Sequence, residues 1–293
     1  MNEYPFSKIL KTFYTFCLTL SFMICLSVQS FAQYKCSAQD SLIFNKLMQK
    51  AEKLQWKQFS IGKIITLTGE QFIQTPYVAS TLNQSDQESD LIINLTGLDC
   101  TTYVEQVLAM AQCIKNNQTH FGDFTKALTS IRYRDGKQQG YLSRLHYFTD
   151  WIYDHQKRGM IEDITPQLDG LQMDKNINFM STHRKSYAPL ADAEIFKGIQ
   201  EIERQINQRQ QCYLPKTEIP KHQAQIQDGD LITLVTTIKG LDVSHVGFAH
   251  WMGDELHFMH ASSKHGVMIT SVPLVDYLMK FKSNKGVIVL RAL

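Results

Sequence analysis

"SHVGFAHWMGDELHFMHAS", residues 244–262, contains two apolar runs that are separated by the turn residues Gly253 and Asp254. Runs of this composition, bounded by turn residues, predict β-strands. Three runs of the same kind flank the stretch: DLITLVTTI lies before it, and GVMIT and GVIVLRAL lie after it. The chain after Lys221 is therefore expected to form an antiparallel sheet.

The chain before this sheet has a helical pattern. Helices are expected over 38–57, 100–114, 142–158 and 190–209, whereas residues 58–98 are expected to be loop-rich. Helices followed by an antiparallel sheet predict an α+β fold. We expect a single domain over residues 33–293.

The composition limits the classes of function. Of the 293 residues, 43% are hydrophobic and 20% are charged, which is typical of a globular protein. The net charge is only +2, so a nucleic-acid partner is not expected.

The N-terminal residues resemble an export signal. Lys8 and Lys11 precede an apolar run over 13–28, and the small residues Ser30 and Ala32 follow it. This layout predicts a signal peptide over 1–32 and an exported protein, periplasmic or extracellular, without stable membrane insertion after cleavage. A membrane anchor is the alternative, but the run is short for a span.

Four cysteines remain after removal of the signal peptide: Cys36, Cys100, Cys113 and Cys212. An oxidising compartment would allow two disulfides. Cys100 and Cys113 are about 20 Å apart along one predicted helix, so they cannot pair with each other. A bridge between Cys36 and Cys212 is possible.

Cys100 stands at the start of the predicted helix 100–114, directly after Asp99, a natural N-cap. The unpaired N–H groups and the helix dipole at this end stabilise a thiolate. Cys100 is therefore a candidate nucleophile. The alternative is a small buried hydrophobic residue, which is the common role of a free cysteine.

A base for this thiol is available among the histidines of the sheet. Strand alternation places His245 on one face with Gly247 and Ala249, two small residues that would let a helix N-terminus approach. On the next strand, the same alternation places His260 on the opposite face from His257. We expect His245 as base and His260 as the group that orients it. The other histidines, His250, His257 and His265, are expected to be structural or solvent-facing.

Several motifs together resemble a known family. LDCTTYVEQVLA resembles the nucleophile helix of the NlpC-type cell-wall cysteine peptidases, and SHVGFAHWMGDELHFMHASSKHGVMI resembles their sheet motifs. TPYVASTL resembles their tyrosine-bearing substrate loop. Together with SRLHYFTDWI and NFMSTH, the set resembles the branch called N-acetylmuramoyl-L-alanine amidase-like, from about residue 60 to the end.

The resemblance implies a papain-like fold and hydrolysis of amide bonds in peptidoglycan stem peptides, without a cofactor or metal. By position, Cys100 matches the nucleophile, His245 the base and His260 the orienting residue. Tyr77, Asp99 and Ser244 are then assigned to substrate binding. Tyr77 could instead simply pack a turn, and Asp99 could be only a helix cap. The long separation of Cys100 from His245 implies a helical insertion over about 130–225.

Three arginines, Arg132, Arg134 and Arg144, form a basic cluster with interleaved tyrosines. They could bind carboxylates of a muropeptide through bidentate contacts. The alternative is a solvated face.

Two other functions fit part of the sequence. A zinc amidase could use the histidines, but the sequence has no His-Glu-x-x-His motif. A binding module without turnover would be expected to have lost a member of the Cys-His-His set.

Overall fold

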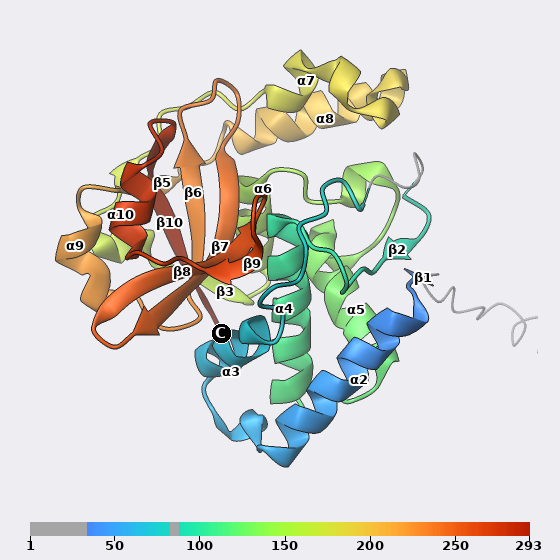
Figure 1. Cartoon of the computed structure of the whole chain (residues 1–293). Coiled ribbons are helices and arrows are strands. Elements are labelled where there is room, and N and C mark those ends of the chain that lie inside the picture. The colour runs from blue at the N-terminus through green and yellow to red at the C-terminus, as the bar shows by residue number, and fades with distance from the viewer. Residues whose placement is uncertain (1–33, 83–87) are drawn as a thin grey trace, which may run out of the picture. The chain divides into compact units, whose positions relative to one another are not determined.

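The centre of the fold is an eight-stranded antiparallel sheet (Figure 1). The computed structural model describes residues 34–82 and 88–293, and residues 34–293 form one compact unit. The predicted signal peptide, residues 1–32, lies outside the described residues. The strand order is β4 (Leu171–Gln172), β5 (Cys212–Pro215), β10 (Asn284–Ala292), β6 (Leu231–Thr236), β7 (Val243–Met252), β8 (Glu255–Ser262) and β9 (Gly266–Ile269), and β3 (Ile161–Asp163) also pairs with β10.

The five runs predicted as strands are confirmed, because they form β6 to β10. Their side chains alternate between two apolar cores, as a sheet covered on both faces requires. Val246, Phe248 and Met259 belong to the core shared with α4 (Cys100–Lys115). Leu234 and Phe258 belong to the core shared with α10 (Leu274–Met279). Figure 1 shows α4 and α10 with the strands between them.

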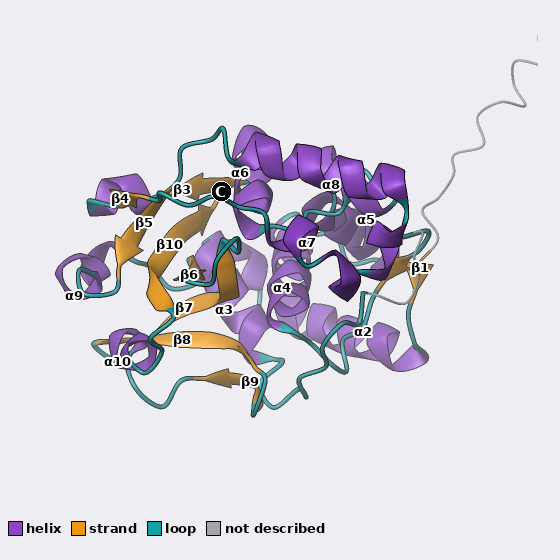
Figure 2. Cartoon of the chain, turned by 90° about the horizontal axis from the view of Figure 1, so that it is seen from above, coloured by secondary structure: helices purple, strands orange, loops and turns teal. Residues whose placement is uncertain are grey.

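The remaining helices are mostly on the α4 side of the sheet, as Figure 2 shows from above. They are α2 (Ala38–Lys53), α3 (Ile61–Glu70), α5 (Phe121–Arg132), α6 (Phe148–Lys157), α7 (Phe179–Thr182) and α8 (Ala193–Ile206), and the short α9 (Ile219–His222) follows β5. A two-residue parallel pair joins β1 (Tyr34–Lys35) to β2 (Leu91–Ile92). None of the helices within residues 34–82 and 88–293 is long and apolar enough to cross a membrane.

Several predictions of elements need correction. Residues 58–98 contain the helix α3, and α5 was not predicted at all. The helix predicted from residue 142 begins at Phe148. The segment 130–225 is not a purely helical insertion, because it supplies β3, β4 and β5 to the sheet.

Candidate functional site

Cys100 is the first residue of α4, as predicted, and Asp99 is its N-cap. The Asp99 carboxylate accepts a hydrogen bond from the backbone N–H of Thr102 at 2.8 Å. The Thr102 hydroxyl in turn accepts the backbone N–H of Asp99 at 3.0 Å. This reciprocal capping box fixes the helix start, and with it the position of the sulfur.

Cys100 is a half-buried residue that packs against the core shared by α4 and the sheet. The backbone N–H of Val246, the residue after His245, lies within hydrogen-bonding reach of the Cys100 sulfur. Burial, followed by the charge of Asp99, raises the pKa of the Cys100 thiol to about 11, and contacts with Thr101 and Val246 lower it only in part. In the free protein the pKa of this thiol is therefore raised, contrary to the expected stabilised thiolate.

Tyr77 lies beside the thiol on a loop that is held from two sides. The backbone N–H of Leu98 donates to Pro76 O at 3.0 Å, and the N–H of Val267 in β9 donates to Thr75 O at 2.9 Å. Burial, and the nearby Cys100 and Asp99, raise the pKa of the Tyr77 hydroxyl to about 12. Tyr77 is therefore a neutral hydrogen-bonding group next to the cysteine.

His245 and His260 are in direct contact, since Nε2 of His245 lies 2.7 Å from Nδ1 of His260. The His260 ring is stacked on Phe258 at 4.7 Å and lies 5.3 Å from the ring of Tyr277 in α10. Burial lowers the pKa of His245 to about 4, and burial together with His245 lowers that of His260 to about 3. Both imidazoles are therefore neutral at pH 7.

The face of β7 on which α4 packs was predicted incorrectly. α4 lies against Val246 and Phe248, and the ring centroids of Tyr103 and Phe248 are 5.7 Å apart. The small residue Gly247 instead leaves space on the other face, where an added Cβ would lie 2.8 Å from Cβ of His260. This glycine lets β8 bring His260 next to His245.

The other histidines make structural contacts or lie at the surface. His257 is buried, and its Nδ1 lies 2.7 Å from the carbonyl oxygen of Thr270. His250 contacts the Glu70 carboxylate at 3.0 Å. His265 is exposed, but it lines the cavity described next.

A cavity of about 360 Å³ opens beside the two imidazoles. Ser244 is exposed at this cavity, and its hydroxyl lies 3.4 Å from Leu234 O. Five of the lining residues lie in the β8–β9 turn and in the segment between α10 and β10, and of these five only His265 was named in the sequence analysis. The lining residues are Leu234, Ser244, His245, His260, Ser262, Ser263, Lys264, His265, Tyr277, Phe281, Ser283 and Asn284.

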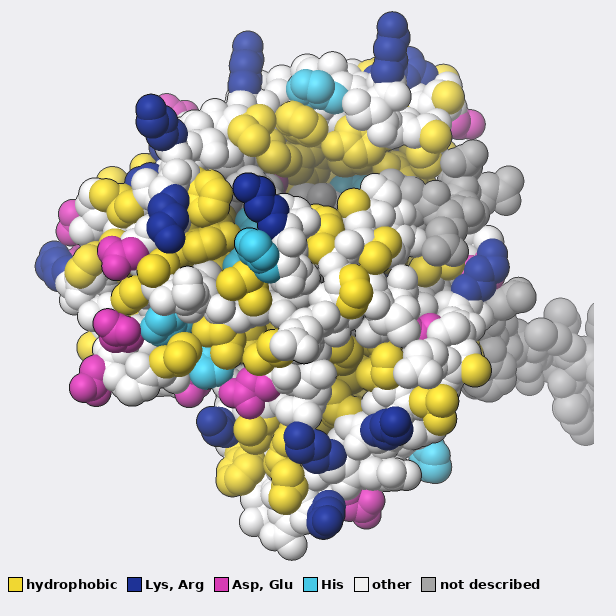
Figure 3. All heavy atoms as spheres, in the orientation of Figure 1, with side chains coloured by type: hydrophobic (Ala, Val, Ile, Leu, Met, Phe, Trp, Pro, Cys, Tyr) yellow, Lys and Arg dark blue, Asp and Glu magenta, His cyan; other side chains and the backbone are white. Residues whose placement is uncertain are grey.

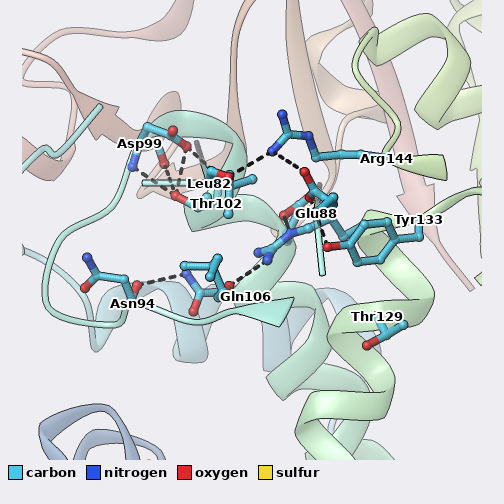
Figure 4. Close-up of polar contacts among 12 residues, drawn as sticks. Leu82, Glu88, Asn94, Asp99, Thr102, Gln106, Thr129, Tyr133 and Arg144 are labelled. Carbon is cyan, nitrogen blue, oxygen red and sulfur yellow. Dashed lines mark hydrogen bonds and ion pairs between the residues drawn. The ribbon is translucent and has the colours of Figure 1, made fainter. Parts of the chain in front are cut away.

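The three arginines of the predicted basic cluster form ion pairs within the protein. They are therefore neither a solvated face nor a set of guanidinium groups available to substrate carboxylates, and both predictions are corrected. Arg132 is buried and pairs with Glu105 at 2.7 Å. Arg144 is 8% exposed and pairs with Glu88 at 3.3 Å. Figure 4 shows Glu88 between Arg144 and the hydroxyl of Tyr133.

Arg134 is the third member of the cluster, and it too has an internal partner. Its guanidinium group lies 2.6 Å from the buried Asp150 carboxylate, which also pairs with Arg209. In the space-filling view the Lys and Arg side chains are spread over the face (Figure 3). The three arginines therefore hold segments of the fold together.

The cysteines of the described residues form no disulfide bond. Cys36, Cys100, Cys113 and Cys212 are free thiols, so the possible Cys36–Cys212 bridge is not formed in this structure. Within residues 34–82 and 88–293, no group of three or more His, Cys, Asp or Glu side chains is arranged to hold a metal ion.

Residues 67–287 match the family described as N-acetylmuramoyl-L-alanine amidase-like. Among solved structures, an N-acetylmuramoyl-L-alanine amidase from Bacteroides uniformis is 37% identical, with a TM-score of 0.75. That match covers 79% of this chain and 98% of the other. No curated protein matches the chain.

Two further structures are similar. A Bacteroides fragilis protein with the provisional name xylanase is 41% identical, over 76% of this chain and 99% of the other, with a TM-score of 0.72. A Legionella pneumophila protein is 24% identical, over 87% and 95% of the two chains, with a TM-score of 0.65, and this likeness concerns the fold alone.

Proposed function

Because the chain belongs to the N-acetylmuramoyl-L-alanine amidase-like family of peptidoglycan-related hydrolases, we propose that it cleaves an amide bond of peptidoglycan with Cys100 as nucleophile. The observation that carries this proposal is the position of Cys100. A thiol at a capped helix start contacts the backbone of the strand that carries the paired imidazoles His245 and His260.

The protonation states decide how the reaction begins. The pKa of Cys100 is raised and that of His245 is lowered, so the free site holds a neutral thiol and a neutral imidazole. The base must therefore take the thiol proton as the sulfur attacks the amide carbonyl carbon. The imidazolium then gives this proton to the leaving amine, and a thioester to Cys100 is formed.

Water completes the cycle. His245, neutral again, accepts a proton from a water molecule that attacks the thioester carbonyl. The acyl group leaves as a carboxylic acid, and the proton returns to the Cys100 sulfur. Unpaired backbone N–H groups at the start of α4 are suited to stabilise the oxyanion in both steps.

His260 acts as a positioning residue for the base. When Nδ1 of His245 faces the thiol, Nε2 carries the ring hydrogen and donates it to Nδ1 of His260 at 2.7 Å. The rings of Phe258 and Tyr277 hold His260 in place. In this arrangement the contact holds His245 as the tautomer that can accept a proton from sulfur.

The names of the Bacteroides uniformis relatives favour the amide between N-acetylmuramic acid and L-alanine as the bond that is cleaved. Glycosidase chemistry, which the name of the Bacteroides fragilis relative would imply, needs a pair of carboxyl groups. The described lining of the cavity beside His245 contains neither aspartate nor glutamate. We therefore propose amide hydrolysis.

Two further parts of the proposal follow from the sequence motifs. The helix-borne cysteine and strand-borne histidines support a papain-like, NlpC-type fold. The signal-like residues 1–32 support export to the compartment that holds peptidoglycan.

Mass spectrometry of a defined N-acetylmuramoyl tripeptide, before and after incubation, tests the proposed function. We expect wild-type protein to release the peptide with or without EDTA, and Cys100→Ala to release none. Loss of activity with EDTA that zinc restores would replace the proposal with a zinc amidase. Folded wild-type protein that binds the muropeptide without cleaving it would indicate a binding module.

A further inference from the structure

We propose that the cavity beside His245 and His260 binds the carboxylate-bearing peptide part of the substrate, an inference that rests on the proposed function. The cavity has a volume of about 360 Å³ and includes both imidazoles in its lining, but not Cys100. A group bound there therefore lies on the histidine side of the reacting bond.

The charge of the cavity selects an anion. The described lining has no acidic side chain, whereas it contains Lys264 and His265 of the β8–β9 turn. Three serines, Ser262, Ser263 and Ser283, add hydroxyl donors, whereas the Ser244 hydroxyl donates to Leu234 O. A lysine ammonium group surrounded by neutral donors favours a carboxylate over an uncharged amide.

The buried part of the lining adds a preference for peptide. Asn284 is 5% exposed and donates its amide hydrogens to the carbonyl oxygens of Val235 and Gly286. Its Oδ1 has no hydrogen-bond partner among the described residues. Tyr277 and Phe281 supply apolar surface for the chain of a bound peptide.

The cavity is also connected to the nucleophile side of the site. The turn with Lys264 continues into Gly266 and Val267, and the Val267 N–H donates to Thr75 O at 2.9 Å. An added Cβ on Gly266 would lie 2.3 Å from the same oxygen, so only glycine permits this close approach. The short strand β9 thus joins the Lys264 turn to the Tyr77 loop, which lies beside Cys100.

Stem peptides carry the matching chemistry, because a γ-linked glutamate retains a free α-carboxylate beside its peptide N–H. Isothermal titration calorimetry on the full chain with Cys100→Ala, which prevents turnover, tests the inference. The probes are the tripeptide L-alanyl-γ-D-glutamyl-L-lysine and its form with both carboxylates amidated.

We expect the acid form to bind about tenfold more tightly than the amide form, and Lys264→Gln to weaken the acid form about fivefold without affecting the amide form. Lys264→Arg should restore the affinity to within about twofold. Lys126→Gln, at an exposed lysine of α5 outside the cavity, is the matched control and should change neither affinity.

Equal affinity for the two probes, or an equal effect of Lys264→Gln on both, would overturn the inference. Hydrolysis of muropeptides by the wild-type chain would still support the proposed function in that case. Conversely, acid-selective binding that depends on Lys264, in a wild-type chain that hydrolyses nothing, would overturn the proposed function and leave the cavity as a site for acidic peptides.

Discussion

Burial determines the protonation of the proposed base. The pKa of His245 is lowered from 6.5 to about 4, so the imidazole stays neutral at pH values where an exposed histidine is protonated. Only the neutral ring accepts the thiol proton. We therefore predict that kcat/KM falls on the acid side with a midpoint near pH 4, in a pH–rate profile with wild-type protein. A midpoint near pH 6.5 would contradict this environment of His245.

The two histidines of β8 have different predicted roles. His260 contacts His245, whereas His257 contacts Thr270 O on the opposite face. His260→Ala should lower kcat about 100-fold, because the base loses the group that fixes its tautomer, and His257→Ala should change kcat less than about threefold. Paired kcat measurements check this, with circular dichroism as the control for folding. A larger loss of kcat in His257→Ala would mean that His257, and not His260, positions the base.

At the scale of elements, β7 and β8 approach closely because residue 247 is glycine. An added Cβ would lie 2.5 Å from Met259 O and 2.8 Å from Cβ of His260. Gly247→Ala should therefore lower the free energy of unfolding by about 2 kcal/mol and also lower kcat. The control is Gly122→Ala in α5, where an added Cβ meets no atom within 4 Å. Equal melting temperatures for the two variants would contradict this packing.

The helices and strands that were predicted correctly are those whose residue pattern lies within one short segment of the chain. The strands β6 to β10 are continuous apolar runs between turn residues, and Asp99 marks the start of α4 clearly. α3 was missed because its β-branched residues and Gly62 weaken the helical signal, although Ser60 caps it. The sequence of α5 carries a helical stripe, Phe124, Leu128 and Ile131, so this helix was predictable.

At the scale of the whole molecule, the arginine cluster shows what the sequence alone cannot indicate. The acidic partners of Arg132, Arg134 and Arg144 are distant from them in sequence. The spacing of the arginines therefore suggested an exposed basic cluster, whereas in the fold each arginine forms an internal ion pair. The pair of His245 and His260 was predictable because the two residues lie in one hairpin. The cavity could not be predicted, because its lining also includes residues of α10 and of the segment after α10.

The ion pair of Arg132 and Glu105 is fully enclosed, so removal of one partner leaves a buried carboxylate without compensation. Arg132→Met should lower the free energy of unfolding by about 3 kcal/mol. The control is Arg204→Met, which removes an exposed pair with Glu201 and should change stability by less than about 1 kcal/mol. Urea denaturation measures both changes. If Arg132→Met left stability unchanged but weakened the binding of muropeptide, the prediction that Arg132 binds substrate would be supported instead.

The central claim is that the substrate acyl group is transferred to the sulfur of Cys100. Acid-quenched reactions of the wild-type chain with an N-acetylmuramoyl tripeptide, analysed by mass spectrometry of the protein and its peptides, test this claim directly. We predict a covalent acyl adduct on the peptide that contains Cys100, absent from Cys100→Ala, which should also release no product. Product release by folded Cys100→Ala at a rate close to that of wild type would contradict the claim.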